Sequence, residues 1–274
     1  MHAMARELPQ PDRDRLSALI ALVVLTYGLV RVISLPSVTA EFTALGLVVK
    51  LEFGTRFVML SLASAVAAAG CDWLVRSHPH ATVRGWRVEH WIIPGLGAFG
   101  AGAILTRLPQ GPGLWGGLLV AAGLLVGVVA AEFIVIDQDD PRRESASLGL
   151  TVLAYLLLLG TFFTGAALGV RLVFSAPLVL VVSSAVVWRV LRLTDAARRI
   201  EPYAIGIGLA AAQLAVALHY WPLDPLRYAL ILVLAVYVAQ VLTQAHLKSA
   251  FAAWEMIELS AVVLLSLGAI FVLA

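Results

Sequence analysis

Apolar stretches run almost without interruption along this 274-residue chain. A helix that crosses a bilayer needs about 20 mostly apolar residues, because the hydrocarbon core is about 30 Å thick and each helical residue rises 1.5 Å. Segments with turn and charge signals, such as 109–113 and 139–143, separate the stretches. Nine stretches approach the required length: 16–35, 55–74, 90–108, 114–136, 148–170, 174–193, 203–220, 226–244 and 255–273. The sequence therefore predicts an all-α, polytopic transmembrane helical bundle of about nine helices.

The composition excludes a water-soluble domain. Charged residues make up 13% of the chain, whereas soluble domains have about 25%. The net charge of +2 comes from short basic clusters between apolar stretches, with no extended basic arm, so nucleic acid is not an expected partner. The expected partners are the lipid bilayer and other membrane subunits. We expect a short cytoplasmic segment over 1–15 and a single transmembrane domain over 16–274.

Basic residues are unevenly distributed when the stretches alternate across a membrane from a cytoplasmic N-terminus. Of the 19 Lys and Arg residues, 13 fall in segments placed inside, five fall outside, and Arg31 lies within the first stretch. Cytoplasmic loops carry such an excess in membrane proteins. The bias predicts an N-inside, C-outside, multi-pass protein of the bacterial cytoplasmic membrane.

Two local patterns modify this picture. Residues 49–53 alternate apolar and polar side chains, a period-two pattern that predicts an extended segment at the outer interface. Glycines four residues apart, which let helices approach closely, occur at 113 and 117, 123 and 127, and 165 and 169. Packing within the bundle is the favoured interpretation of these glycine pairs, with a dimer interface as the alternative.

Polar residues collect at the helix ends that the charge bias places in the cytoplasm. A charged side chain in the membrane costs at least about 2.5 kcal/mol, so each one is a functional candidate. Candidates for catalytic or metal-binding chemistry are Asp72, Glu132, Asp137 and Asp139. Candidates for ligand binding or proton coupling are Arg76, His78, His219, His246 and Glu258. Polar helix ends that simply meet water and headgroups are the alternative explanation for most of them.

Glu132 and Glu258 stand out because both fall inside an apolar stretch. A carboxylate there needs a cationic partner such as Arg76 or Arg189, or a proton. Histidine can also ligate haem or chlorophyll, so His90, His219 and His246 are nominal ligands, although no motif surrounds them. The sequence has no nucleotide-binding loop, no Cys/His metal spacing and no nucleophile elbow, and it identifies no cofactor and no metal.

Two segments, 70–79 (GCDWLVRSHP) and 219–225 (HYWPLDP), resemble an uncharacterised bacterial family of multi-pass membrane proteins of unknown function. The resemblance implies the fold but no activity. Separately, Asp137, Asp139 and Asp140 resemble one of the two aspartate-rich motifs with which intramembrane prenyltransferases hold magnesium. The segment around Asp72 has a single aspartate where the other motif would have several acidic residues. The resemblance therefore does not extend to the second of the two motifs that would bind the substrate.

Three classes of function remain. The first is a non-enzymatic subunit or scaffold of a membrane complex, in keeping with short loops and glycine-rich surfaces. The second is a membrane-embedded enzyme that acts on a lipid or polyprenyl substrate at the cytoplasmic face. The third is a proton-coupled transporter that uses Glu132 and Glu258.

Overall fold

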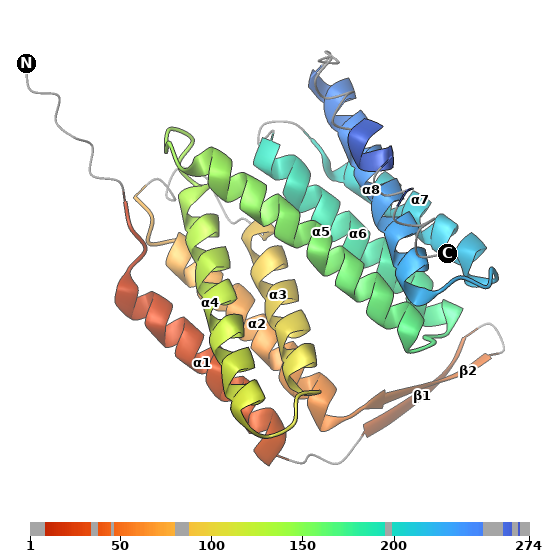
Figure 1. The fold of residues 1–274 in the computed structure, drawn as a ribbon, viewed down its shortest axis with the longest axis horizontal. Coiled ribbons are helices and arrows are strands. Elements are labelled where there is room, and N and C mark those ends of the chain that lie inside the picture. The colour runs from red at the N-terminus through yellow and green to blue at the C-terminus, as the bar shows by residue number, and fades with distance from the viewer. Residues whose placement is uncertain are drawn as a thin grey trace, which may run out of the picture. The chain divides into compact units, whose positions relative to one another are not determined.

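The computed structural model describes residues 9–33, 38–44, 47–79, 88–194, 199–248, 260–264 and 268 (Figure 1). The chain divides into two compact units, residues 1–150 and 151–274, and the boundary falls inside one helix. Eight helices have defined bounds in the described residues: α1 (Arg13–Val32), α2 (Thr55–Val75), α3 (Glu89–Leu105), α4 (Pro112–Ile134), α5 (Arg143–Ala167), α6 (Leu172–Thr194), α7 (Glu201–His219) and α8 (Pro225–Lys248).

Seven of these helices are long and apolar enough to cross a membrane; α3 is the exception. This confirms the predicted helical membrane bundle. With 17 residues, α3 is about 25 Å long, which is less than the hydrocarbon thickness. Of the ninth predicted span, residues 260–264 and 268 are helical, and its other residues lie outside the described part of the chain.

A two-stranded antiparallel hairpin joins α1 to α2. Strand β1 (Val38–Ala44) pairs with β2 (Leu47–Phe53), and the Cα partners run from Val38 with Phe53 to Ala44 with Leu47. The period-two pattern over 49–53 therefore does indicate a strand, which is β2. The sequence analysis did not predict the partner strand β1. Pairing gives the backbone amides and carbonyls of both segments hydrogen-bond partners that a lone strand would lack.

In the first unit α1, α2, α3 and α4 pack around a core in which small residues allow close approach (Figure 1). Ala63 and Ala67 of α2 are fully buried. A Cβ built on Gly102 of α3 would lie 2.7 Å from a Tyr27 ring carbon, so only glycine fits there. Close contact of this kind drives helix association in hydrocarbon, where burial of apolar surface no longer does.

Polar groups of α1 also hold α3 through its backbone. The Tyr27 hydroxyl donates to the carbonyl of Ala98 at 2.6 Å. Arg31 donates to the carbonyls of Leu105 and Leu108, at 2.8 and 2.6 Å. These acceptors lie at the end of α3 and just beyond it, where the Leu105 carbonyl also accepts from the backbone N–H of Leu108 at 3.2 Å, so Arg31 helps to cap the helix.

In the second unit α7 packs against α6 and α8. The closest approach is at Gly208 of α7, where an added Cβ would lie 2.7 Å from the carbonyl oxygen of Leu180 and 2.0 Å from Ser184 Oγ. The serine can rotate away, but the backbone carbonyl cannot. Gly206, two residues earlier and so on another side of α7, has open space around it in the described residues.

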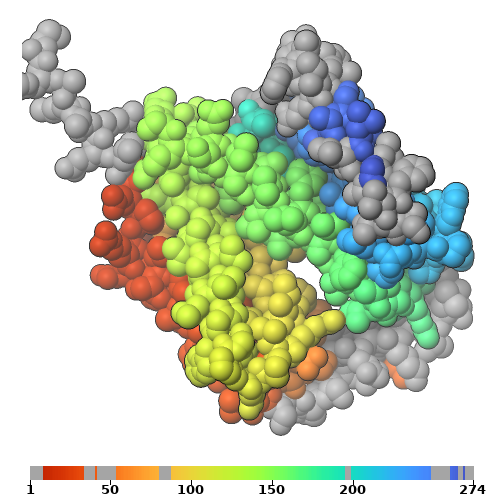
Figure 2. All heavy atoms as spheres, viewed as in Figure 1, coloured from red at the N-terminus to blue at the C-terminus, as the bar shows by residue number. Residues whose placement is uncertain are grey.

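Large apolar side chains cover the outside of the helices. Leu119 and Trp115 of α4 are 75% and 69% exposed, and α4 lies on the face of the first unit that Figure 2 shows. Monomeric soluble proteins rarely expose continuous apolar surface on this scale. Lipid is the solvent that such a surface fits.

The contact at Gly208 generates a test of α6–α7 packing. We expect Gly208→Ala to destabilise the protein by about 1–3 kcal/mol, because overpacking forces the two helices apart. Gly206→Ala, in the same helix, should leave the midpoint of thermal unfolding in detergent unchanged. Equal midpoints for the two variants would show that α6 and α7 are not in close contact at Gly208.

Candidate functional site

Buried ionisable residues of the first unit gather at one end of its helices. They lie just after α2, in the first turn of α3, in the last turn of α4 and in the loop that leads to α5. All of them are less than 9% exposed: His78, Glu89, His90, Glu132, Asp137 and Asp140. The charge bias predicts that this end faces the cytoplasm, where the sequence places its collection of polar residues.

The centre of this group is a contact between α3 and α4. His90 Nδ1 lies 2.7 Å from Glu132 Oε2, and the Glu132 side chain is fully buried. An ionised carboxylate is costly to bury alone, and an imidazole at hydrogen-bonding distance offsets part of that cost. The sequence predicts a cationic partner for Glu132, such as Arg76 or Arg189, or a proton. The structure adds the imidazole of His90, a nominal haem ligand in the sequence analysis, at hydrogen-bonding distance.

A second histidine contacts the neighbouring residue of α4. The ring of His78 meets Phe133 edge-on, with 4.6 Å between ring centroids. Of the influences that lower the pKa of the Asp140 carboxyl, that of His78 is the smallest. The two histidines contact consecutive residues of α4.

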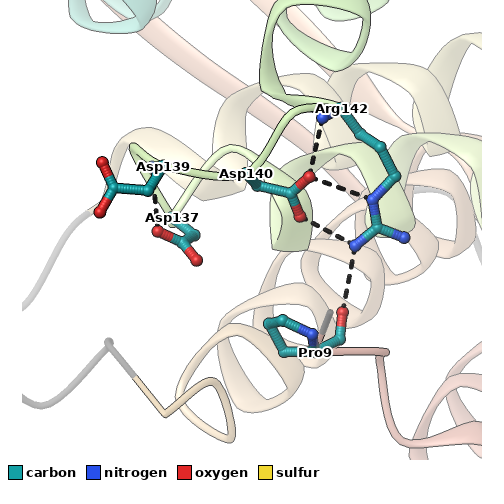
Figure 3. Close-up of polar contacts among 5 residues, drawn as sticks. All are labelled: Pro9, Asp137, Asp139, Asp140 and Arg142. Atoms are coloured by element: carbon teal, nitrogen blue, oxygen red, sulfur yellow. Dashed lines mark hydrogen bonds and ion pairs between the residues drawn. The ribbon is translucent and has the colours of Figure 1, made fainter. Parts of the chain in front are cut away.

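That loop is held by a forked ion pair (Figure 3). Arg142 donates from Nε to Asp140 Oδ1 at 3.1 Å and from Nη2 to Oδ2 at 2.8 Å. The same Nη2 donates to the carbonyl of Pro9 at 3.3 Å, which ties the segment before α1 to this end of the unit. The Arg142 hydrogen bonds lower the pKa of the Asp140 carboxyl below its usual value.

Asp137 and Asp139 form a local turn. The backbone N–H of Asp139 donates to Asp137 Oδ1 at 3.1 Å, and the two side chains point away from the Asp140–Arg142 pair (Figure 3). Such a bond is typical of aspartate in loops. Among the described residues, no three His, Cys, Asp or Glu side chains come together as a metal site. The magnesium site that the prenyltransferase resemblance implies thus has no counterpart in the described part of the chain.

The other predicted residues occupy separate places. Asp72 and Arg76 form the expected i, i+4 ion pair, with 2.7 Å between Oδ2 and Nε. His246 is exposed near the end of α8, and Glu258 lies outside the described residues. His219 is exposed at the end of α7, with its ring edge-on to Tyr220, and it lines a pocket of the second unit.

Sequence reasoning missed one polar contact within the second unit. The Tyr155 hydroxyl of α5 donates to Gln240 Oε1 of α8, and Gln240 is buried. Tyr155 was not a candidate, because a single tyrosine in an apolar helix has no distinguishing pattern.

The fold and this polar end define a multi-pass helical membrane protein. The chain belongs to DUF5656, a family of proteins of unknown function, whose model matches residues 35–273. No curated protein and no solved structure matches the chain. The resemblance to an uncharacterised family is thereby confirmed.

The Asp140–Arg142 pair gives a pH-dependent prediction. Because folding lowers its pKa, Asp140 stabilises the fold above its unfolded pKa of about 3.9, and this contribution is lost as the pH falls through the lowered value. At neutral pH, Asp140→Asn should lower the thermal midpoint by roughly 5 °C, since hydrogen bonds to charged groups contribute about 1.5–3 kcal/mol.

Thermal unfolding from pH 7 to pH 3 checks this expectation. The difference between wild type and Asp140→Asn should be constant down to about pH 4 and shrink below it. Glu144→Gln removes an exposed carboxylate from the first turn of α5 and is the control. A difference that persists at the lowest pH would rule out the ionised carboxylate as its source.

Proposed function

We propose that this protein is a proton-coupled membrane transporter in which His90 and Glu132 bind and release the coupled proton. The observation that carries the proposal is their contact, 2.7 Å apart and buried between α3 and α4. With neutral imidazole and ionised carboxylate the pair has a charge of −1, and one added proton makes it neutral. Because the added proton changes the charge and the hydrogen bonding of the two side chains, its uptake changes the stability of the α3–α4 contact.

The sequence of α3 suits a helix whose first turns move. Pro94 lies four residues after His90 and has no N–H, so the His90 carbonyl lacks its usual helical donor. The Ser64 hydroxyl of α2 donates to the carbonyl of Gly95, the residue after Pro94, at 2.9 Å. A helix weakened at this point can change the position of His90 at a lower cost than an unbroken helix.

We further propose that the same group of residues forms a path for protons to and from water. The ring of His78 contacts Phe133, the residue after Glu132, and Asp140 and Arg142 connect the acidic loop with the segment before α1. Ionisable side chains inside membrane proteins typically mark proton or substrate pathways. We place this end in the cytoplasm of a bacterium, as the excess of basic residues indicates.

Infrared difference spectra between high and low pH, recorded in liposomes, test proton binding without knowledge of the substrate. We expect wild-type protein to show a protonated-carboxyl band that Glu132→Gln removes and Glu144→Gln retains. His90→Gln keeps a polar side chain but cannot be charged, so it should shift the pH at which the band appears. A band that survives in Glu132→Gln would refute the assignment.

Transport itself needs a second measurement. In liposomes with a pH-sensitive dye inside, a membrane potential should drive proton entry through wild-type protein, and Glu132→Gln should reduce the rate at least about tenfold, as expected for loss of an essential proton carrier. If protons entered no faster than in empty liposomes at every potential tested, the protein would bind protons without transporting them, and the proposed function would be overturned.

A second candidate is a non-enzymatic subunit of a membrane complex, and one observation favours it. Gly123 and Gly127 of α4 were expected to pack inside the bundle, yet an added Cβ at either meets nothing within 4 Å in the described residues. Gly117, by contrast, packs against Leu105 and Leu108. An open small-xxx-small face is the kind of surface on which another transmembrane helix packs.

Gentle purification from native membranes, followed by mass spectrometry, tests the subunit role. A stoichiometric partner should accompany wild-type protein and be lost from a Gly123→Leu, Gly127→Leu double variant. Gly206→Leu fills open space on α7 and is the control. Purification without a partner, or a partner retained by the double variant, would count against this role for α4.

In the enzyme alternative the carboxylates would have to leave their present partners, so the geometry supports it least.

A further inference from the structure

The second unit has a pocket that the proton-binding group does not explain. It lies where α5 and α7 end and α6 and α8 begin, and it has a volume of about 160 Å³. Phe162, Val179 and Tyr228 form its buried part. His219 and Trp221 are exposed where the pocket meets the surface. The charge bias places this end of the helices on the outer side of the membrane.

The size of the pocket limits what it can hold. An engineered cavity of about 150 Å³ in another protein binds benzene, so this pocket accommodates a single six-membered ring. Gly165 of α5 and Gly169, two residues after its end, form part of the wall, and an added Cβ at either meets nothing within 4 Å in the described residues. These glycines leave the space open, because most other side chains would reduce it.

The chemistry of the lining limits the ligand further. Among the described residues that line the pocket, none is Asp, Glu, Lys or Arg, so a charged ligand would have no counter-ion. The Thr161 hydroxyl donates to the carbonyl of Leu157 at 2.7 Å, and that of Ser175 points to the carbonyl of Leu172 at 3.5 Å. The other side chains of the lining that can donate to an occupant are His219, Tyr228 and, through its indole N–H, Trp221.

We propose that this pocket binds the ring of a neutral, lipid-soluble quinone. A benzoquinone ring has the right size, carries no charge, and presents two carbonyl acceptors for the donors of His219 and Tyr228. The aromatic rings of Phe162 and Trp221 offer stacking surfaces. The hydrophobic tail leaves through the open side into lipid. The proposal concerns binding alone, and it is independent of the proton site in the first unit.

Binding is measured with 2-decyl-1,4-benzoquinone, which quenches tryptophan fluorescence, in protein reconstituted into lipid nanodiscs. We expect saturable quenching in wild type. Gly165→Leu should weaken binding at least about tenfold, because its side chain fills the ring site. Gly160→Leu is the matched control, since it adds the same side chain at another open glycine of α5 that does not line the pocket. It should bind as wild type does.

Two further measurements keep the proposal testable if Gly165→Leu does not fold. Replacement of the exposed His219 by Leu, and of Tyr228 by Phe, should each weaken binding about five- to tenfold through loss of one hydrogen bond. Decylbenzene, which has the ring and tail but no acceptors, should fail to displace the quinone. Displacement by decylbenzene at equal concentration, or wild-type affinity in all three variants, would overturn the proposal.

Discussion

Close contact between helices is the constraint on which the rest of this structure depends. Inside a bilayer the lipid is as apolar as the helices, so association relies on packing and on the few polar contacts available. Fully buried Ala63 and Ala67, and the contacts that Gly102 and Gly208 make with neighbouring helices, show how the chain meets this requirement. Where the helices are this close, the positions of polar side chains are fixed within narrow limits.

The polar end of the first unit depends on that rigidity. Glu132 and His90 come from different helices, and their contact exists because α3 and α4 pack beside each other. A buried ion pair contributes little net stability, since the loss of hydration offsets the attraction between its members. Stability alone therefore gives little reason for this contact, and in the function proposed above it binds a proton.

The helices could be predicted from the sequence because each is defined locally by about 20 apolar residues. The contacts between them could not. His90 and Glu132 are 42 positions apart, and nothing in the pattern of either helix selects the other. The pocket of the second unit was missed for the same reason, since four helix ends form it. Gly123 and Gly127 were assigned to internal packing because spacing alone does not tell which side of a helix faces the bundle.

The attachment of α3 to α1 has a consequence for how this chain tolerates substitution. Tyr27 and Arg31 bind main-chain carbonyls of residues 98, 105 and 108. Every amino acid supplies such a carbonyl, whereas each donor has few substitutes. The two sides of this contact are therefore unequal: the donors are limited by their hydrogen bonds, and the acceptor positions are limited only by how well their side chains fill the core.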